Sequence, residues 1–409
     1  MAEASGRADA TQPIGMPRWH EPVMIMPWEV LSPLQGGALM GLVYFLGAGF
    51  SAAYGLPMMN QFFPFARQCP LLDDNQRRFL AEVQRFAHMG VRLVNISRNN
   101  MEEMLSFLEM AEQGGQVPDR IRALSRHADN AVPPSEMLKR IIAAVYGPLT
   151  IDTAHWQYLA RYAAATFALD GSDPAAGLAQ VRSGTLIPGP TRSIQPQRMT
   201  IITTNYDLCI EVQLLRFNRL RVRLVGNWVS SSGNPQGKGE NAEASIYDSE
   251  SPVTLLRLHG AVNWGIASQI GLDGKLQYDF RVVSHLDPKD RLPWAIKSDL
   301  YGAESTTPFL VAPTILKHQA DGPYAEQWRE AAKALAKARH VIFVGYSFPE
   351  SDAYMRYFLG ASLSENVDLE SIIIVDPRAD EIVGRLAANR GYGPHFVDML
   401  RPYGRRWDE

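Results

Sequence analysis

The chain has 409 residues, of which 46% are hydrophobic and 20% are charged, and its net charge at pH 7 is −3. This is the composition of an ordinary globular protein, and the near-neutral balance argues against nucleic-acid-binding and membrane-surface classes. Two cysteines are too few for a disulfide framework or a four-cysteine zinc site, so we expect no metal. No apolar run reaches the roughly 18 residues of a membrane helix, and the polar N-terminus does not resemble a signal peptide. We therefore expect a cytoplasmic protein.

Taken in chain order, the sequence begins with a proline-rich stretch that shows no periodicity. We expect residues 1–35 to form a flexible N-terminal arm. A first apolar run, Gly41–Leu46, predicts a buried strand. It is followed, from about residue 60 to residue 195, by patterns typical of helices, which we interpret as a helical insertion.

One helix of this insertion has a clear start signal. Asn99 or Asn100, followed three residues later by Glu102 or Glu103, predicts a capping box. The apolar residues that follow at helical spacing are Met101, Met104, Leu105 and Leu108.

Short continuous apolar runs return after the insertion and predict buried parallel strands, with helical segments between several of them. The predicted strands are Met199–Thr204, Val253–Leu258, Pro308–Ala312, His340–Val344 and Ser371–Val375. The predicted helices between and after them are Asp207–Arg216, Tyr324–Arg339, Asp352–Leu363 and Asp380–Asn389. This alternation indicates an α/β fold with a Rossmann-like, doubly wound parallel sheet, spanning residues 36–400 and carrying the helical insertion.

Five of the predicted strands end in small, polar or ionisable residues. Ligands of such sheets bind beyond the carboxyl ends of the strands, so these residues form the candidate site. They are Gly47, Ala48, Gly49 and Ser51 after the first strand, and Asn205 and Asp207 after the second. His259, the pair Gly345 and Ser347, and Asp376 follow the later strands.

The glycine-rich exit from the first strand is the pattern with which a backbone makes room for a phosphate. Backbone N–H groups of Gly47, Ala48 and Gly49 are expected to face the anion, with Ser51 as a hydroxyl donor. Each strand end taken alone has a simpler explanation. The glycines can be a tight turn, and His259 can be a capped core residue. The stretch from Asn205 can be a turn with Asp207 as a helix cap, and Asp376 before Pro377 is ordinary turn chemistry.

Taken together and in order, four motifs resemble the sirtuin family, in particular its bacterial branch of NAD hydrolases in anti-phage defence. The motifs are GAGFSAAYGLP (47–57), TTNYD (203–207), LHGAVNW (258–264) and VGYSFPESD (344–352), and VAPTILK (311–317) also looks like that branch. The resemblance spans about Gly41 to Asp376 and implies a Rossmann-like NAD domain with a smaller inserted module.

Two departures from the deacylases of the family stand out. Those enzymes follow the glycine turn with Pro-Asp-Phe-Arg, whereas this chain has Pro57-Met58-Met59-Asn60. They also carry four zinc-binding cysteines in the small module, which this chain lacks. Both differences argue against protein deacylation and are shared by the branch that hydrolyses free NAD.

The resemblance implies roles for the site residues. Asn205 is expected to hold the nicotinamide ribose and a water, and His259 to activate a ribose hydroxyl or that water, since neutral histidine accepts protons at pH 7. Gly345 and Ser347 are expected on the phosphate and adenosine-ribose side. Asp376 is expected to accept from ribose hydroxyls, as acids do in Rossmann sites. Asp207 either touches the ribose or only caps its helix.

The resemblance thus predicts an NAD glycohydrolase that releases nicotinamide and ADP-ribose and depletes NAD during phage infection. The alternatives are a protein deacylase or ADP-ribosyltransferase, and a non-catalytic subunit that binds NAD or ADP-ribose. About thirty residues follow the last predicted strand, and we interpret 401–409 as a basic tail, so infection would be sensed by other means. We expect a homo-oligomer and a partner protein, either a HerA-type ATPase or a short Argonaute.

Overall fold

The computed structural model describes residues 41–52, 55–90, 99–127, 130–147, 199–211, 214, 221–226, 228–230, 247–270, 276–282, 306–312, 322–349, 352–364, 366–388 and 394–403. The predicted N-terminal arm, residues 1–35, lies outside this part of the chain. So do residues 148–198, the second part of the predicted helical insertion.

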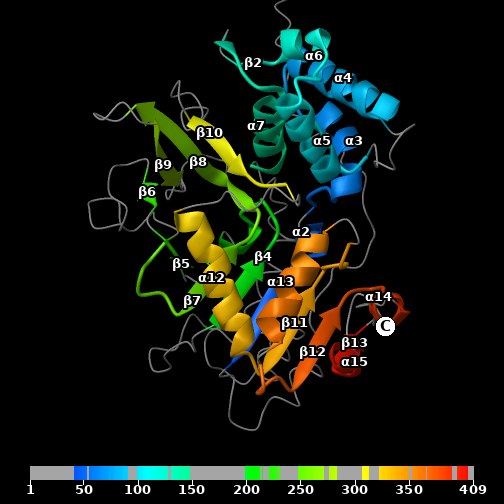
Figure 1. Ribbon diagram of the computed structural model, residues 1–409, viewed down its shortest axis with the longest axis vertical. Helices are drawn as coiled ribbons and strands as arrows, with labels where there is room; N and C mark the ends of the chain where they lie inside the picture. Colours follow the sequence, from blue (N-terminus) through cyan, green and yellow to red (C-terminus); the bar gives the residue numbers. More distant parts are fainter. Residues whose placement is uncertain are drawn as a thin grey trace, which may run out of the picture.

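A seven-stranded parallel sheet forms the centre of the molecule (Figure 1). Its strand order is β13-β12-β11-β1-β4-β7-β5. The strands are β1 (Leu42–Leu46), β4 (Met199–Thr203), β5 (Arg223–Leu224), β7 (Val253–Arg257), β11 (His340–Val344), β12 (Ser371–Val375) and β13 (Leu400–Tyr403). The chain moves from β1 to β4 on one side and later returns to β11 on the other. The predicted Rossmann-like α/β fold is confirmed, and its topological switch point lies between β1 and β11.

Both faces of the sheet are buried, which explains the continuous apolar runs. Val43 and Phe45 of β1 pack on the face covered by the helices of the second half of the chain. These are α12 (Pro323–Ala336), α13 (Ala353–Leu363), α14 (Ala379–Ala388) and α15 (Pro394–Asp398). Leu42, Tyr44 and Leu46 point to the other face, where they cluster with Ile210 and Leu214. Residues 209–211 and 214 are helical, in agreement with the helix predicted after Asp207.

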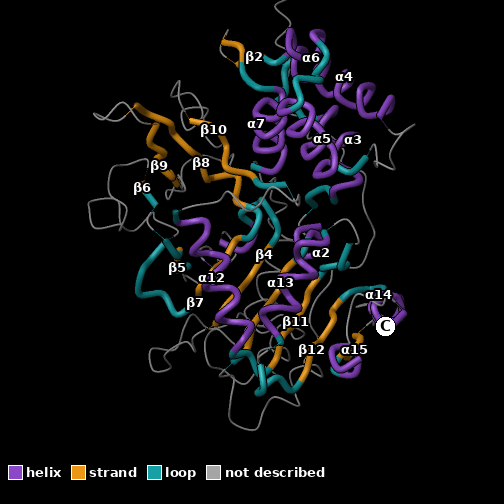
Figure 2. Tube along the Cα trace, in the orientation of Figure 1, coloured by secondary structure: helices purple, strands orange, loops and turns teal. Residues whose placement is uncertain are grey.

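The described part of the insertion is helical, as predicted, and lies beyond the carboxyl edge of the sheet (Figures 1 and 2). After the short α2 (Ala48–Ala52) it consists of η2 (Met59–Gln61), α3 (Phe62–Gln68), α4 (Asp74–Gly90), α5 (Met101–Gln113), α6 (Asp119–Leu124) and α7 (Pro134–Tyr146), with a small hairpin of β2 (Arg126–His127) and β3 (Asn130–Ala131). The N-cap of α5 is Asn100, whose side chain accepts from the backbone N–H groups of Glu102 and Glu103.

A second, four-stranded sheet of order β10-β8-β9-β6 was not predicted from the sequence. Its strands are β6 (Val229–Ser230), β8 (Gly260–Ile270), β9 (Leu276–Val282) and β10 (Thr306–Leu310). The prediction that Pro308–Ala312 belongs to the parallel sheet is wrong, because β10 pairs antiparallel with β8. The chain turns out of the parallel sheet at Gly260, whose φ of +82° is a left-handed conformation that favours glycine.

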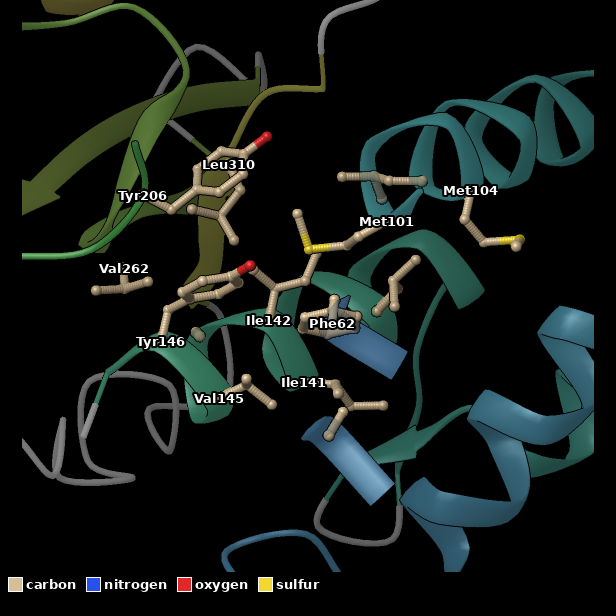
Figure 3. Packing of buried hydrophobic residues seen from close by; sticks show 14 of the residues in the cluster. Phe62, Met101, Met104, Ile141, Ile142, Val145, Tyr146, Tyr206, Val262 and Leu310 are labelled. Carbon is tan, nitrogen blue, oxygen red and sulfur yellow. The ribbon is translucent and has the colours of Figure 1, made fainter. Parts of the chain in front are cut away.

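The helical insertion and the second sheet share one hydrophobic core. Figure 3 shows Met101 and Ile142 of the helices beside Tyr206, which follows β4, and Leu310 of β10. Tyr146 of α7 joins this cluster and donates a hydrogen bond to the carbonyl of Pro57 at 3.0 Å. The insertion is therefore packed into the body of the protein, directly over the strand ends.

The C-terminal segment differs from the predicted basic tail over 401–409. Residues 401–403 belong to β13, which pairs in parallel with β12 and covers that edge of the sheet. The remaining residues of the predicted tail lie outside the described part. Among the described residues, no helix has the length and apolar character needed to cross a membrane.

Candidate functional site

Glycines allow the ends of β1 and β11 to touch at the switch point. Gly47 donates its N–H to the carbonyl of Val344 at 2.9 Å, and Gly49 donates to the carbonyl of Gly345 at 2.9 Å. Gly345 has a φ of +61°, and a Cβ on it would lie 2.3 Å from the nitrogen of Phe50. The expectation that the N–H groups of Gly47 and Gly49 face a phosphate is therefore not met in this structure, because both groups bond to β11 and its turn.

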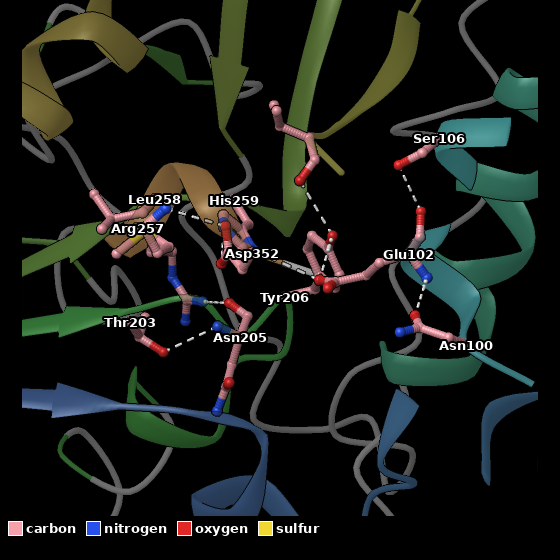
Figure 4. Close-up of polar contacts among 12 residues, drawn as sticks. Asn100, Glu102, Ser106, Thr203, Asn205, Tyr206, Arg257, Leu258, His259 and Asp352 are labelled. Atoms are coloured by element: carbon pink, nitrogen blue, oxygen red, sulfur yellow. Dashed lines mark hydrogen bonds and ion pairs between the residues drawn. The ribbon is translucent and has the colours of Figure 1, made fainter. Parts of the chain in front are cut away.

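Asn205 connects the end of β4 to this glycine junction. Its side-chain nitrogen donates to the carbonyl of Gly47 and to the hydroxyl of Ser51, both at 2.8 Å. Its backbone N–H donates to the Thr203 hydroxyl at 3.1 Å (Figure 4). Three residues predicted separately from two strand ends, Gly47, Ser51 and Asn205, are thus brought into direct contact.

Asp207 caps the helix that follows β4. Its Oδ1 accepts from the backbone N–H of Cys209 at 2.9 Å, which is the geometry of a helix start. This contact corresponds to the helix cap, one of the two roles left open for this residue. The carbonyl of Asp207 accepts a hydrogen bond from Arg257 at 2.7 Å.

Arg257, the last residue of β7, forms a buried ion pair with Glu211. Its Nε and terminal nitrogens contact the two carboxylate oxygens at 2.9 and 2.5 Å, and it also donates to the carbonyl of Asn205 at 2.7 Å. Burial alone would lower the pKa of Arg257, but the adjacent Glu211 raises that pKa above its usual range, so the guanidinium stays charged. This pair fixes the backbone of the strand ends that carry the candidate site.

His259 lies two residues further along, between two carboxylates. Its Nδ1 is 3.5 Å from Oε1 of Glu102, and its Nε2 is 3.8 Å from Oδ2 of Asp352 (Figure 4). The exposed fraction is 1% for His259 and 4% for each of the two acids. The carbonyl of His259 accepts from the N–H of Val311 at 2.9 Å, which holds the residue at the start of the second sheet.

Tyr206 completes this cluster from the end of β4. Its hydroxyl lies 3.0 Å from Oε1 of Glu102 and 3.2 Å from the carbonyl of Val311. Burial raises the pKa of Tyr206 well above its usual value, and the neighbouring Glu102 raises that pKa further. Tyr206 therefore remains a neutral hydrogen-bond donor to a buried carboxylate at all physiological pH values.

Ser347 and Asp376 follow two neighbouring strands, β11 and β12, on the other side of the switch point. Asp376 is buried and accepts from the N–H of Arg378 at 2.9 Å, and its carbonyl accepts from the N–H of Ala379 at the start of α14. Ser347 is exposed, and its carbonyl and that of Phe348 accept hydrogen bonds from Arg385 of α14. The structure thus places these residues at the expected edge, with Asp376 already engaged in the turn.

Two acids of the cluster were not assigned a site role from the sequence. Glu102 is recognisable only as a first-turn residue of a capped helix in the insertion. Asp352 lies inside the motif VGYSFPESD and caps α13 by accepting from the N–H of Met355 at 3.2 Å. Since both positions have an ordinary helix-start explanation, only the spatial contact with His259 reveals them.

Among the described residues, no group of three or more His, Cys, Asp or Glu side chains is arranged to hold a metal ion.

A comparison with known protein families finds one match, which covers the second half of the chain. Residues 199–394 match the family described as the SIR2-like domain. This range contains the motifs of Asn205, His259 and Gly345, while the glycine motif after β1 and Glu102 lie before it. A search among curated proteins gave no match.

Solved structures that match the chain include several of sirtuins. One is of a Sir2 homologue mutant in complex with ADP-ribose, at 13% identity over 86% of this chain and 85% of that chain, with a TM-score of 0.30. A second, entitled "The Structural basis of Sirtuin Substrate Affinity", has 14% identity over 94% and 95% of the two chains and a TM-score of 0.32. A third, of Sir2 with a p53 peptide and NAD+, has 14% identity over 93% and 92% and a TM-score of 0.29.

Proposed function

We propose that this protein is an NAD glycohydrolase, with His259 as the general base and Asn205 as the residue that holds the nicotinamide ribose and a water. The observation that carries the proposal is the position of His259. It lies at the carboxyl edge of the parallel sheet, between the carboxylates of Glu102 and Asp352, 3.5 and 3.8 Å away. The SIR2-like match over residues 199–394 supports an NAD-related activity in general.

The proposed reaction breaks the glycosidic C–N bond between the ribose and nicotinamide. The electron pair of that bond stays on the nicotinamide nitrogen, so a neutral leaving group departs and positive charge develops on the ribose. The oxygen of a water forms the new bond to the same carbon, and its proton passes to Nε2 of His259 and then to solvent. The products are nicotinamide, ADP-ribose and one proton. The carboxylate of Glu102, beside Nδ1, favours the imidazolium that forms in this step.

Binding is proposed at the switch point of the sheet. Ala48 and Ser51 would contact the phosphates, Gly345 and Ser347 the phosphate and adenosine-ribose side, and Asp376 the ribose hydroxyls. Gly47 would serve this site by allowing the strand ends to approach, because a Cβ on it would lie 2.6 Å from the carbonyl oxygen of Gly345. Gly49 would support the same junction through its N–H bond to Gly345. Asp207 contributes by capping the helix after β4.

The reaction requires the cluster to open. His259 is almost fully buried, and Asp352 covers its Nε2. In the proposed reaction Asp352 moves aside, so that water and ribose reach that nitrogen. A closed resting arrangement suits an enzyme that would otherwise exhaust the NAD of its host, because apparent affinity falls with the fraction of molecules in the open arrangement.

We further propose that the biological role is NAD depletion in bacterial anti-phage defence, by a homo-oligomer that a partner protein activates. The support is the resemblance of the four motifs to that branch and the absence of the deacylase features from the sequence. The partner is proposed to be a HerA-type ATPase or a short Argonaute.

The test is incubation of purified protein with NAD, alone and with the product of a neighbouring gene, with nicotinamide and ADP-ribose measured separately. We expect both products in equal amounts, and their loss in His259→Asn. The matched control is His340→Asn, a histidine at the opposite edge of the sheet. Absence of nicotinamide under all conditions would refute the proposal. Nicotinamide released only with an acylated peptide, or ADP-ribose found on protein, would favour the transferase alternatives.

A further inference from the structure

We propose that Glu102 of the helical insertion is a positioning residue for His259, holding the imidazole with its Nδ1 proton toward the helix and its Nε2 free to accept a proton. This inference rests on the proposed function and adds a residue from outside the SIR2-like match. It makes the insertion part of the reaction centre instead of a mere cover over the strand ends.

The carboxylate of Glu102 is held firmly by its surroundings. Its backbone N–H donates to the Asn100 cap at 3.0 Å, and its carbonyl accepts from the Ser106 hydroxyl at 2.8 Å (Figure 4). Its side-chain Oε1 lies 3.0 Å from the Tyr206 hydroxyl. The flanking Met101 and Met104 are fully buried in the core shared with the second sheet. Two hydrogen bonds thus fix the backbone of Glu102, and one, from Tyr206, holds its carboxylate beside His259.

Burial of a carboxylate at this position calls for an explanation. Glu102 is only 4% exposed, so its carboxylate is largely removed from water. Such burial is unfavourable unless other groups compensate. The first turn of α5 and Tyr206 compensate in part. The remaining neighbour is Nδ1 of His259 at 3.5 Å, and a carboxylate there favours a proton on that nitrogen.

The position of Glu102 determines which of the two ring nitrogens of His259 carries the proton. With the proton held on Nδ1, the lone pair is on Nε2, which faces Asp352 and the site. When Nε2 accepts the proton of the attacking water, the resulting imidazolium keeps the Glu102 carboxylate beside its Nδ1. A buried acid behind a catalytic imidazole has the same effect in hydrolases with a histidine base, where it fixes the tautomer and favours the cation.

The charged and titratable groups around His259 come from four elements. They are Glu102 on α5, Asp352 before α13 and Tyr206 after β4, with Tyr146 of α7 behind Glu102. Removal of the Glu102 charge leaves Asp352 as the one carboxylate in contact with the ring among the described residues. The imidazolium should then form only at lower pH.

The experiment compares Glu102→Gln with Glu103→Gln, its neighbour on the same helical turn. Glu103 accepts from the Asn100 side chain at 3.1 Å and has no contact with His259 among the described residues. We expect Glu102→Gln to lower kcat for NAD cleavage by roughly 10- to 100-fold, less than loss of the base itself, with KM changed little. The acidic limb of the kcat–pH profile should move to lower pH. Glu103→Gln should keep the wild-type profile.

A second measurement does not depend on activity. Nitrogen NMR of the histidine rings, with the His259 signal assigned through His259→Asn, reports which ring nitrogen carries the proton at neutral pH. We expect Nδ1–H in the wild type and a mixture of tautomers in Glu102→Gln. A predominant Nε2–H form in the wild type, or an unchanged ring in Glu102→Gln, would overturn the role of Glu102. If the ring behaves as expected but NAD is not cleaved, the proposed function fails and the positioning stands.

Discussion

Two buried clusters of ionisable side chains, one around Arg257 and one around His259, lie at the end of β7. They differ in the number of acids and in the distances to them. Around Arg257, one fixed cation meets one carboxylate, and the guanidinium donates to Glu211 and to the carbonyls of Asn205 and Asp207 at 2.5 to 2.9 Å. Every one of these distances is that of a strong hydrogen bond. Arg257 is therefore saturated with partners and its charge is balanced.

Around His259, two acids flank one imidazole ring, and the separations of 3.5 and 3.8 Å exceed those of good hydrogen bonds. A protonated ring would offset one of the two carboxylates, whereas a neutral ring offsets neither. The Arg257 pair already has balanced charge and a full set of hydrogen bonds. A proton on His259, in contrast, would strengthen its interaction with the neighbouring acids. The contrast favours a structural role for Arg257 and Glu211, and under the proposed function it favours proton transfer at His259.

The largest effect that would sharpen this contrast is expected from His259→Asn. Under the proposed function this variant loses the general base, and NAD cleavage should fall by about 100- to 10,000-fold. The free energy of unfolding should change far less than in variants of the Arg257 pair, because the contacts of the ring are long. Nicotinamide release measures the rate of NAD cleavage, and urea unfolding of the same preparation measures the free energy of unfolding. Retention of full activity would remove His259 from the mechanism.

The reverse result is expected from Glu211→Ala. It leaves the Arg257 guanidinium buried without its counter-ion, and removal of one partner of such a pair typically costs about 3–5 kcal/mol of unfolding free energy. Activity of the molecules that remain folded should be reduced only through the shifted backbone of Asn205.

The double variant Arg257→Met, Glu211→Leu serves as the control for this prediction. It removes both charges together, and most of the lost stability should return. A Glu211→Ala variant as stable as wild type would break the distinction between the two clusters.

A smaller but diagnostic effect is expected from Gly345→Ala at the switch point. A residue with a side chain at φ +61° costs about 1–3 kcal/mol, and the new Cβ would in addition lie 2.3 Å from the nitrogen of Phe50. Gly360→Ala in α13 is the matched control, since a Cβ there meets no atom within 4 Å and helix propensity improves. Thermal unfolding of both variants decides the role of this glycine. Weaker NAD binding in Gly345→Ala with unchanged stability would mean that it serves only as a phosphate contact.

The parallel sheet could be predicted from the sequence because strands buried on both faces leave continuous apolar runs, as in Leu42–Leu46 and His340–Val344. The second sheet could not, since only Leu258 and His259 separate β7 from β8, and no loop marks where one strand ends and the other begins. The short β13 carries Arg401 and Pro402, which do not indicate a strand.

The site was predictable where its residues follow strands of the parallel sheet, as Asn205, His259 and Ser51 do. Local patterns alone did not indicate Glu102, because the contact joins residues 157 positions apart through the packing of the insertion on the second sheet. The glycine motif was recognised, but the actual partners of Gly47 and Gly49 depend on how closely β1 and β11 approach. That approach is a tertiary property.

The smallest expected effect is the pH dependence of stability due to His340, the first residue of β11. His340 lies beside one exposed acid, Glu370, whereas His259 lies between two buried acids. Burial lowers the pKa of His340, although Glu370 beside it acts in the opposite direction. The unfolded chain therefore takes up a proton at higher pH than the folded protein. As the pH falls below about 6.5, the ordinary value for histidine, this residue should reduce the free energy of unfolding. His340→Asn keeps a hydrogen-bonding side chain beside the Ser371 hydroxyl, which lies 2.9 Å from Nδ1 in the wild type, and removes the titration. Urea unfolding at pH 7.5 and pH 5.5 should then show a smaller loss of stability in the variant than in the wild type. If the variant lost as much unfolding free energy as the wild type, or more, His340 would be protonated as easily in the folded protein as in the unfolded chain. The surroundings of β11 would then tolerate a charge that burial is expected to disfavour.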